Sequence, residues 1–501
     1  MTPTAEGQLT QAGPVAAPAE GGDGWRTPSL VGLLAFLVAF AGSWIPSVWV
    51  DEVATIDMVG RPWPDMFDIL RHVDAVHGAY YVLLHAWSEA FGLSPVSLRI
   101  PSAIAVGLVA AGTVVLGRTL AGARAGLVAG LVVLILPATT WAGEEARSSA
   151  FVMAASVWAA VALVGALRGR SRRWWAYGAL VALTGVLFLQ AFLVVLAHAV
   201  SLLWSRAGAQ TWRRFGLAAG AAAVVVAPVA AFGLSQRGQV AWIQRPGADV
   251  VEAVLVRQWF GGSRVLGLAV WLAVGAIVLV PRLVPAVRSA TPLSLLHLAV
   301  PWLLLPTALV VAVSVVSTPQ YTPRYLRYGV VPVALLLGTG IAALRRTWMQ
   351  VVAFCVIGLL SLPPYVAERG EHAKEGYDWS SAADAVSSHG ADGDGVVFVP
   401  DDGAYQSPRR ASEAYPAAFR GLADVGHDRS GRVGQVWADG VPEAAADAAM
   451  ADLGTVWVLV EHKALAGESD AWLARHRAAG WTATLVYDGP RTDVYRLTSS
   501  S

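Results

Sequence analysis

Long apolar runs recur from Ser29 to Tyr365, separated by short polar segments. About 20 apolar residues in a helix cross the roughly 30 Å hydrocarbon core of a bilayer. The runs on either side of Gln190 are short, and reading them as one helix would invert the topology of everything that follows. We therefore predict an α-helical polytopic membrane protein with eleven spans, at Ser29–Val48, Ile100–Gly117, Ala125–Trp141, Ser148–Leu167, Trp174–Leu189, Ala191–Trp204, Phe215–Leu234, Val265–Val280, Leu293–Val316, Tyr328–Leu344 and Trp348–Tyr365.

The chain before the first span has a different character. Residues 1–28 are rich in Gly, Pro, Ala and Thr and show no periodicity, which predicts a disordered tail. A cleaved signal peptide is the alternative for the first apolar run. The long polar tail and the length of the run argue against it, so we expect residues 29–366 to form the membrane domain.

Charged and small polar residues return after Tyr365, and the pattern becomes that of a soluble α/β domain. Residues 367–501 are about the size of one ordinary domain. We predict helices at Asp378–His389, Pro442–Asp452 and Ala471–Ala479, and strands at Gly395–Pro400, Thr455–Val460, Trp481–Tyr487 and Thr492–Leu497, the last two forming a hairpin.

Composition agrees with a membrane protein. Apolar residues make up 55% of the chain, charged residues only 14%, and the mean hydropathy is +0.54. Soluble domains carry about 25% charged residues, and disordered chains need low hydrophobicity and high net charge. The net charge of +1 lacks the basic excess of a nucleic-acid-binding protein. Because Cys355 is the single cysteine, disulfide scaffolds and cysteine metal sites are excluded.

The polar segments between the spans fall into two classes. Cytoplasmic loops collect Lys and Arg, and with a cytoplasmic N-terminus alternate loops contain arginines without carboxylates. The C-terminal domain is then extracytoplasmic. Gly78–Gly92 is short and contains His85 and Glu89, so we read it as a helix on the outer face. The inner arginines are Arg118, Arg124, Arg168, Arg170, Arg172, Arg173, Arg206, Arg213, Arg214, Arg282, Arg288, Arg345 and Arg346.

The first outer loop, residues 49–98, opens with the adjacent carboxylates Asp51 and Glu52. Ionisable residues at a membrane boundary that face a cavity are functional candidates. A carboxylate at this place can act as a general base toward a hydroxyl. The alternative is a helix end entering water, where acidic residues cost little. We take Asp51 and Glu52 as the candidate catalytic residues.

The segment from Arg71 to Tyr81 mixes His, Asp and aromatic residues. His72, Asp74 and His77 are metal-ligand types, but no further ligand is indicated, so we assign no metal. Tyrosines at this position also serve as interfacial anchors. We expect the substrate pocket to be lined by Asp74, His77, Tyr80, Glu145, Gln190, Gln320 and Tyr325.

Three arginines lie at outer membrane boundaries: Arg99 in RIPS, Arg147 in GEEARSS and Arg324 in PQYTPRYLRY. Arginine binds phosphate by bidentate hydrogen bonds, and its alternative role here is snorkelling to headgroups. Three such sites on the face that carries Asp51 favour phosphate binding. They indicate a sugar donor linked to a lipid phosphate, with Asp51 deprotonating the acceptor hydroxyl and inversion at the anomeric carbon. No GxxxxGK[ST] nucleotide loop is present, and no cofactor is required.

The order of these motifs resembles the GT-C fold glycosyltransferases, in particular the protein O-mannosyltransferases and the bacterial aminoarabinose transferases that modify lipid A. The resemblance covers roughly residues 29–345 and rests on WVDE, HGAYYVLLHAW, RIPS, GEEARSSAF and PRYL. The chain departs from it at Val76-His77-Gly78, where many relatives have two prolines, and at Ser149, where many have tyrosine. The C-terminal domain resembles the α/β domain of actinobacterial members.

The resemblance implies a polyprenyl-phosphate donor of a mannose- or arabinose-type sugar and an extracytoplasmic active site. Asp51 then matches the essential acidic residue of the family, and Arg99 and Arg324 match its phosphate-side arginines. The acceptor would be a hydroxyl of a cell-envelope glycan, lipid or protein. A transporter or flippase is the alternative, but transporters place polar sites near the bilayer midplane. A receptor that binds a partner through the C-terminal domain is a further alternative.

Overall fold

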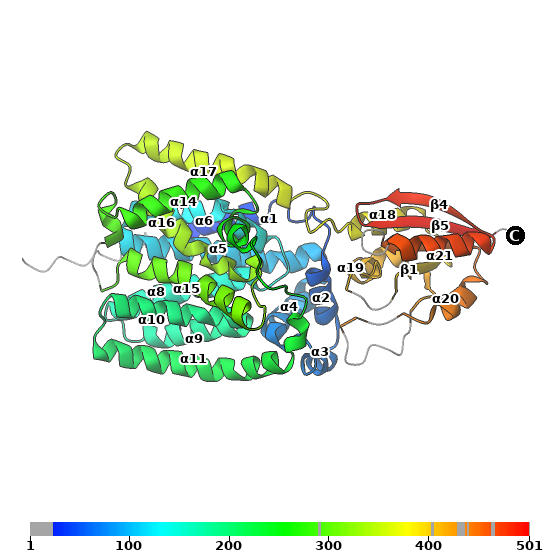
Figure 1. Ribbon diagram of the computed structural model, residues 1–501, viewed down its shortest axis with the longest axis horizontal. Helices are drawn as coiled ribbons and strands as arrows, with labels where there is room; N and C mark the ends of the chain where they lie inside the picture. Colours follow the sequence, from blue (N-terminus) through cyan, green and yellow to red (C-terminus); the bar gives the residue numbers. More distant parts are fainter. Residues whose placement is uncertain are drawn as a thin grey trace, which may run out of the picture.

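A computed structural model describes residues 24–288, 292–401, 405–427, 436–437, 440–461 and 466–499. Most of the predicted disordered tail, residues 1–23, lies outside the described residues. Figure 1 shows a bundle of long helices with a smaller α/β domain beside one of its ends. Short helices of residues 50–91 lie between the two parts.

Each predicted span contains an apolar helix. Among the described residues, six helices are long and apolar enough to cross a membrane, or eight if each of two bent helix pairs is one span. The count of eleven crossings therefore stays a prediction. The helices are α1 (Arg26–Phe40), α5 (Pro95–Ala121), α6 (Ala123–Ile135) with α7 (Pro137–Gly143), α8 (Ser149–Leu167), α9 (Arg173–Leu187), η3 (Leu189–Leu193) with α10 (Val194–Trp204), α11 (Ala209–Ser235), α14 (Arg264–Leu279), α15 (Leu295–Val316), η7 (Pro323–Gly329) with α16 (Val330–Ala342), and α17 (Thr347–Glu368).

The first span differs from its prediction at both ends. Helix α1 begins at Arg26, inside the predicted disordered tail, and ends at Phe40 rather than Val48. Gly42 has a φ of +78°, which a helix does not accommodate, and Pro46 follows. The chain from Ala41 to Trp49 is therefore irregular.

Helix α5 lies at the centre of the bundle and packs against α1, α6 and α8. Its most apolar window is 83% buried, whereas the corresponding windows of α11 and α17 are 11% and 17% buried. Glycine permits close contact between helices. A Cβ atom on Gly126 would lie 2.4 Å from the Arg118 nitrogen, and one on Gly338 would lie 2.4 Å from the Ala129 Cα. The packing of α6 against α5 and α16 therefore requires glycine at these two positions.

The loops between the long helices carry short helices. The first loop holds α2 (Val50–Gly60), α3 (Trp63–Leu70), η2 (Ala75–His77) and α4 (Gly78–Phe91). Helix α4 confirms that residues 78–92 form a short helix, and it packs against α2. A later loop holds η4 (Arg237–Val240), α12 (Val250–Glu252), η5 (Ala253–Arg257) and α13 (Gln258–Phe260), and η6 (Pro285–Arg288) lies before α15.

The C-terminal domain contains a five-stranded sheet in the order β2-β1-β3-β5-β4. Strands β2 and β3 pair in parallel with β1, with Val397 opposite Val458, whereas β5 is antiparallel to β3 and β4. The four predicted strands and the hairpin are confirmed. The sequence does not predict β2, because two residues are too short for a strand pattern. This strand is defined only by its pairing with β1. The strands are β1 (Gly395–Val399), β2 (Ala423–Asp424), β3 (Thr455–Glu461), β4 (Trp481–Asp488) and β5 (Thr492–Ser499).

Alternating strand residues cover the two faces of this sheet. Val397 and Val399 pack with Met450 and Trp472 on one face, and Phe398 packs on the other. Helices therefore cover both faces, as expected where parallel strands are buried. The helices of the domain are α18 (Trp379–His389), α19 (Arg410–Ala414), η8 (Pro416–Phe419), α20 (Glu443–Met450) and α21 (Ala466–Ala478).

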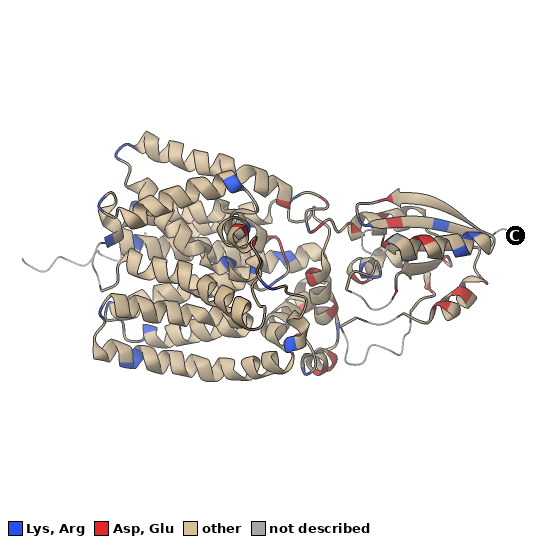
Figure 2. Cartoon of the chain, viewed as in Figure 1, with Lys and Arg blue, Asp and Glu red and all other residues tan. Residues whose placement is uncertain are grey.

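Charge is segregated along the bundle. Figure 2 shows Lys and Arg, without Asp or Glu among the described residues, at the end of the bundle far from the C-terminal domain. Asp and Glu are mixed with Arg at the opposite end, around α2 and α3. The tertiary structure thus gathers the two loop classes of the sequence at opposite ends of the molecule.

Candidate functional site

A cavity of ≈ 930 Å³ opens at the end of the bundle that carries α2 and η2. The C-terminal domain contributes Glu375, Tyr377, Tyr405 and Gln406 to its wall. Eight of the predicted site residues line it together: Asp51, Asp74, His77, Arg147, Gln190, Gln320, Arg324 and Tyr325. The structure places Glu52, Tyr80, Arg99 and Glu145 outside this lining.

Asp51 lies in the first turn of α2, whose N-cap Trp49 has an extended backbone. Backbone N–H groups at a helix N-terminus favour a negative charge, so the carboxylate suits this position. Its side chain is one quarter exposed, and Oδ2 lies 3.4 Å from Nη2 of Arg324. The Asp51 carboxylate is therefore accessible from the cavity and close to a fixed positive charge.

Three aromatic rings surround the guanidinium of Arg324. Its Cζ lies 4.9 Å from the ring centre of Trp49, 5.4 Å from Trp242 and 5.7 Å from Tyr325. Cation–π contacts of this length hold the guanidinium plane in place. Its Nε is buried and has no hydrogen-bond partner in the structure. A ligand anion in the cavity would supply the missing acceptor.

Arg147 also lines the cavity, and its guanidinium connects α2 with η2. Its Nη1 donates to the Asp51 carbonyl oxygen at 3.2 Å, and its Nη2 donates to His77 Nε2 at 3.1 Å. The segment carrying Arg147 is tied to α2, because Thr55 Oγ1 donates to the Ala146 carbonyl oxygen at 3.1 Å. Arg147 and Arg324 therefore approach Asp51 from different elements.

His77 is held as a neutral imidazole. Burial first, and then the positive charge of Arg147, lower the pKa of His77 from 6.5 to about 4. Because arginine can only donate, His77 Nε2 accepts its hydrogen bond and Nδ1 carries the proton. A neutral His77 with its N–H on Nδ1 can donate to a polar group but adds no charge.

The shifted pKa of His77 predicts a pH-dependent stability. The unfolded chain binds this proton at pH 6.5 and the folded protein only near pH 4, so lowering the pH between these values favours unfolding. We expect the midpoint of thermal denaturation to fall over this interval, and His77→Gln to flatten the fall. His72→Gln, at an exposed position nearby, should leave the profile unchanged. An identical profile for His77→Gln and wild type would contradict the prediction.

A strained loop presents Asp74 and His77. Asp74 has a φ of +59°, which is unusual for a residue with a Cβ. Its N–H donates to Gln239 Oε1 at 3.2 Å, the Ala75 N–H donates to Gln236 Oε1 at 3.0 Å, and Tyr81 Oη donates to Asp74 Oδ2 at 2.6 Å. Side chains distant in sequence thus hold the loop in its conformation.

Two glutamines and Tyr325 complete the predicted pocket. Gln190 Nε2 donates to the Gln320 carbonyl oxygen at 3.2 Å, and Gln190 Oε1 is buried with no partner in the structure. Gln320 is held by its N–H, which donates to Ser314 Oγ at 3.0 Å. The chain is not α-helical between the end of α9 and the start of α10, and residues 188–190 of this break line the cavity.

Glu52 and Arg99 lie elsewhere than expected. Both side chains are 1% exposed and form an ion pair, with Arg99 Nη2 2.6 Å from Glu52 Oε2. Arg99 Nε also donates to Glu52 Oε1, and Nη1 and Nη2 donate to the carbonyl oxygens of Ser43, Pro46 and Ser47. Because all N–H groups of Arg99 are used in these hydrogen bonds, none is left to bind the phosphate of a sugar donor in this structure.

Like Arg99, the buried side chain of Glu52 joins separate segments of the chain through hydrogen bonds. Its Oε1 also accepts from the Ala146 N–H at 2.9 Å. Burial by itself would raise the pKa of the Glu52 carboxyl, but the charge and hydrogen bonds of Arg99 outweigh it and the pKa lies below its ordinary value. Glu52 positions α2 against α5 and against the segment that carries Arg147, and does not contact the cavity.

Tyr80 and Glu145 are also buried away from the cavity. Tyr80 is 0% exposed and packs edge-on against Phe151. Glu145 accepts from Ser149 Oγ at 2.7 Å and from Trp141 Nε1 at 3.1 Å. On α4, Tyr81 rather than Tyr80 reaches the loop of the cavity, since one position on a helix rotates a side chain by about 100°.

Sequence reasoning missed several residues of the site. Trp49 belongs to the WVDE motif, but that motif predicts a role only for its carboxylates, and Trp242 lies in a loop without a recognisable pattern. Glu375, whose Oε1 lies 3.9 Å from Arg324 Nη1, lies between α17 and α18 at the start of the C-terminal domain. Its contribution depends on how the C-terminal domain folds back. Within the described part of the chain, no group of three His, Cys, Asp or Glu side chains is placed to hold a metal ion.

Comparison with known proteins shows similarity in structure. ArnT from Cupriavidus metallidurans bound to undecaprenyl phosphate has a TM-score of 0.57 and 15% identity, covering 95% of this chain and 98% of that chain. The apo state of the same protein has a TM-score of 0.59 and 15% identity, covering 93% and 97%. The arabinofuranosyltransferase AftD from Mycobacteria has a TM-score of 0.49 and 15% identity, covering 95% of this chain and 40% of that one.

No protein-family model matches the chain, and no curated protein matches it by sequence. The likeness to ArnT extends over nearly the full length of both chains. It includes the helical bundle and the small C-terminal sheet, and the helices of this chain are apolar enough to cross a membrane several times. The chain therefore has the GT-C fold that ArnT also has, and its apolar helices indicate a multi-pass membrane protein.

Proposed function

We propose that this protein is an inverting glycosyltransferase that moves a sugar from a polyprenyl-phosphate donor to a hydroxyl of a cell-envelope acceptor. The observation that carries the proposal is the placement of the Asp51 carboxylate 3.4 Å from Arg324, whose guanidinium is caged by aromatic rings and retains a buried, unpartnered Nε. A general base and a phosphate-binding group therefore face one cavity. The sugar would be of the mannose or arabinose type.

In the proposed reaction, Asp51 removes the proton of the acceptor hydroxyl while its oxygen attacks the anomeric carbon of the donor. The bond from that carbon to the phosphate oxygen breaks, and its electron pair stays on the lipid phosphate. Arg324 donates hydrogen bonds to the phosphate as its charge develops, and Arg147 adds a second positive charge nearby. Attack on the face opposite the leaving group inverts the configuration.

Two observations support a lipid-linked donor. ArnT of similar fold was solved with undecaprenyl phosphate bound. The cavity of this chain opens at the charged end of an apolar bundle, where an anionic headgroup can lie at the membrane surface while its hydrocarbon stays in the bilayer. The arginine-only loops at the other end favour a cytoplasmic N-terminus and an extracytoplasmic C-terminal domain.

The domain organisation follows from this orientation. Residues 29–366 would form the membrane domain, with the catalytic first outer loop at 49–98, and residues 367–501 the extracytoplasmic domain. Glu375 and Tyr377 of the latter line the cavity. The extracytoplasmic domain would therefore take part in substrate binding.

Replacing Arg324 tests the donor. We expect Arg324→Gln to weaken binding of undecaprenyl phosphate about 10- to 100-fold, because a hydrogen bond to a charged group is worth about 1.5–3 kcal/mol. The measurement is native mass spectrometry of the detergent-purified protein with this lipid. It is accompanied by transfer assays with undecaprenyl-phosphate-linked mannose and arabinose.

Arg264→Gln is the matched control. Arg264 is 76% exposed and pairs with Glu252 away from the cavity, so its replacement should leave lipid binding at the wild-type level. Equal lipid binding by Arg324→Gln and Arg264→Gln would refute the phosphate role of Arg324. Absence of transfer from either sugar donor by wild type would count against the proposed function.

A further inference from the structure

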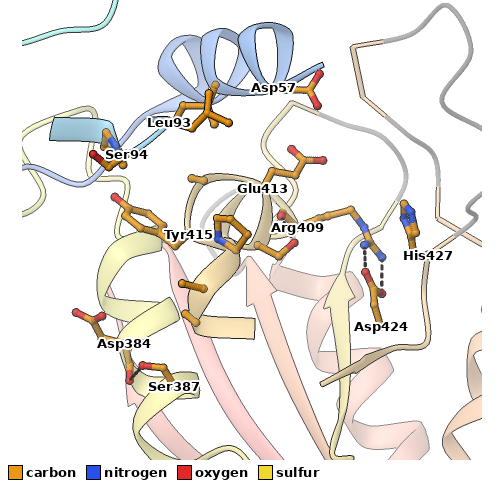
Figure 3. Close-up of a pocket in the computed structure, with 18 of the residues that line it drawn as sticks. Asp57, Leu93, Ser94, Asp384, Ser387, Arg409, Glu413, Tyr415, Asp424 and His427 are labelled. Carbon is orange, nitrogen blue, oxygen red and sulfur yellow. Dashed lines mark hydrogen bonds and ion pairs between the residues drawn. The ribbon is translucent and has the colours of Figure 1, made fainter. Parts of the chain in front are cut away.

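A second cavity of ≈ 860 Å³ lies between α2 and the C-terminal domain (Figure 3). Asp57 of α2 and Leu93 and Ser94 of the loop after α4 lie on one side. Asp384, Arg409 and Asp424 of the C-terminal domain are among the residues on the other side. The cavity therefore exists because the two domains are packed together.

One wall of this second cavity is the carboxyl edge of the parallel strands. Asp401 lies two residues after the end of β1, and Asp424 ends β2. Arg409 joins the two strand ends, with Nε 2.6 Å from Asp401 Oδ1 and Nη2 3.2 Å from Asp424 Oδ1. In open α/β sheets, ligands bind beyond the carboxyl ends of the strands. The position in the fold thus favours a ligand.

Three of the carboxylates that line the second cavity, those of Asp57, Glu413 and Asp424, are held by arginines. Glu413 is 2.6 Å from Arg410 Nη1, and Asp57 Oδ2 is 2.6 Å from Arg61 Nη2. An ionised carboxylate has about four lone-pair sites, so it can accept further hydrogen bonds while its orientation is fixed. These groups would accept hydrogen bonds from hydroxyl groups.

The remaining lining has an apolar part, which includes Ile56, Leu93, Pro416 and the ring of Tyr415, and a polar part made of Ser94, Ser387, Ser412 and His427. A neutral sugar offers hydroxyl donors at its edge and C–H groups on its faces, and so matches both kinds of surface. The acidic residues Asp57, Asp384, Glu413 and Asp424 outnumber the lining arginines Arg61 and Arg409. An anionic ligand is disfavoured by this balance.

Helix α2 forms a wall of both cavities. Asp51 and Ala54 line the first, whereas Asp57 and Arg61 line the second. A rise of 1.5 Å per residue separates Asp51 from Asp57 by about 9 Å along the helix. Val436, a residue of the first cavity, accepts at its carbonyl oxygen from Arg61 Nη2 at 3.2 Å. The two cavities are thus neighbours along one surface.

The second cavity is also tied to the chain just before Asp51. The Val48 N–H donates to Tyr415 Oη at 3.1 Å, and Tyr415 lines the second cavity. This contact holds the C-terminal domain against the segment that leads into Trp49 and Asp51. This contact would therefore keep a molecule that occupies both cavities at a fixed position relative to the Asp51 carboxylate.

We propose that the second cavity binds the neutral oligosaccharide portion of the acceptor, with the terminal sugar of that acceptor reaching into the first cavity so that its hydroxyl meets Asp51. This inference rests on the proposed transferase function and names its acceptor class. It assigns the C-terminal domain the role of holding an extended glycan. A single sugar would occupy only the first cavity and gain nothing from the second.

A bulky substitution at the rim tests this assignment. Ser387 is exposed on α18 and lines the second cavity, whereas Ser388, also exposed and next to it, does not. We expect Ser387→Trp to raise the KM for a tetrasaccharide acceptor about 10-fold, with kcat near wild type. The KM for the methyl glycoside of the same sugar should not change. Ser388→Trp is the matched control and should change neither constant.

The probes are mannose and arabinose oligosaccharides of one and four units, assayed with the matching undecaprenyl-phosphate sugar, and a neutral and a lysine-rich peptide of similar mass. Wild-type preference for the tetrasaccharide, lost in Ser387→Trp, supports the inference. It is overturned if the methyl glycoside and the tetrasaccharide have equal KM values, or if only the basic peptide binds in a Ser387→Trp-sensitive way. Transfer to the methyl glycoside by every variant would show that the proposed function holds even where this inference fails.

Discussion

Replacing Asp51 with Asn is expected to lower kcat for sugar transfer by about 10²- to 10⁴-fold, the usual contribution of a general base. Asparagine keeps the shape of the side chain and its place in the first turn of α2. It replaces the basic carboxylate with an amide, whose oxygen is too weakly basic to take the proton of the acceptor hydroxyl at physiological pH. The measurement is single-turnover transfer from the undecaprenyl-phosphate sugar that wild type uses.

A second measurement, binding of undecaprenyl phosphate, distinguishes a loss of catalysis in Asp51→Asn from a loss of folding or of donor binding. Asp51→Asn should bind undecaprenyl phosphate at least as tightly as wild type, because the negative charge 3.4 Å from Arg324 is removed. The matched control is Asp65→Asn, which alters an exposed aspartate in the first turn of the neighbouring helix α3. A transfer rate for Asp51→Asn within threefold of this control would exclude Asp51 as the base.

Breaking the buried pair of Glu52 and Arg99 is expected to produce the largest loss of stability. Removing one partner of a buried ion pair costs about 3–5 kcal/mol, because the other charge stays buried without compensation. Arg99→Gln leaves the Glu52 carboxylate buried without its positive partner. It also removes the hydrogen bonds to the carbonyl oxygens that Arg99 contacts. We expect a large drop in the thermal denaturation midpoint in detergent, with loss of folded protein at physiological temperature.

The double variant Glu52→Leu/Arg99→Met should recover part of this loss, since apolar residues can replace a buried pair without a stranded charge. The exposed pair of Arg264 and Glu252 is the control, and Glu252→Gln should cost less than about 1 kcal/mol. The outcome also decides between two roles of Glu52. If Glu52→Gln left the midpoint unchanged but abolished transfer, Glu52 would act in the chemistry, as the sequence suggested.

The two acidic neighbours illustrate how far sequence reasoning reaches. The WVDE motif predicted candidate residues in a turn that lines the first cavity, and hydrophobic patterning predicted that this turn lies at a membrane boundary. Adjacent residues on a helix point about 100° apart, so one of the pair faces the cavity and the other faces α5. Nothing in the motif says which, because that depends on where Arg99 lies.

The three boundary arginines show the same limit. All three lie near the ends of long helices, but Arg324 and Arg147 line the cavity, whereas carbonyl oxygens of residues 43–47 enclose Arg99. Those carbonyl groups are available because α1 ends at Phe40 and the chain that follows is irregular. The sequence predicted a continuous span to Val48, and this error concealed the partners of Arg99.

Patterns that depend on near neighbours along the chain were sufficient for the apolar helices, the short helix α4, the four longer strands and the segregation of charge. Membrane spans, strand alternation and loop charge are local signals, since each is decided by hydrophobic burial or by charge within one segment. The cavity that unites residues of the first loop, η3, η7 and the segment between α17 and α18, the aromatic cage of Arg324, and the second cavity between the domains were decided only by the tertiary structure. Each depends on side chains that are distant in sequence and meet only when helices and domains pack.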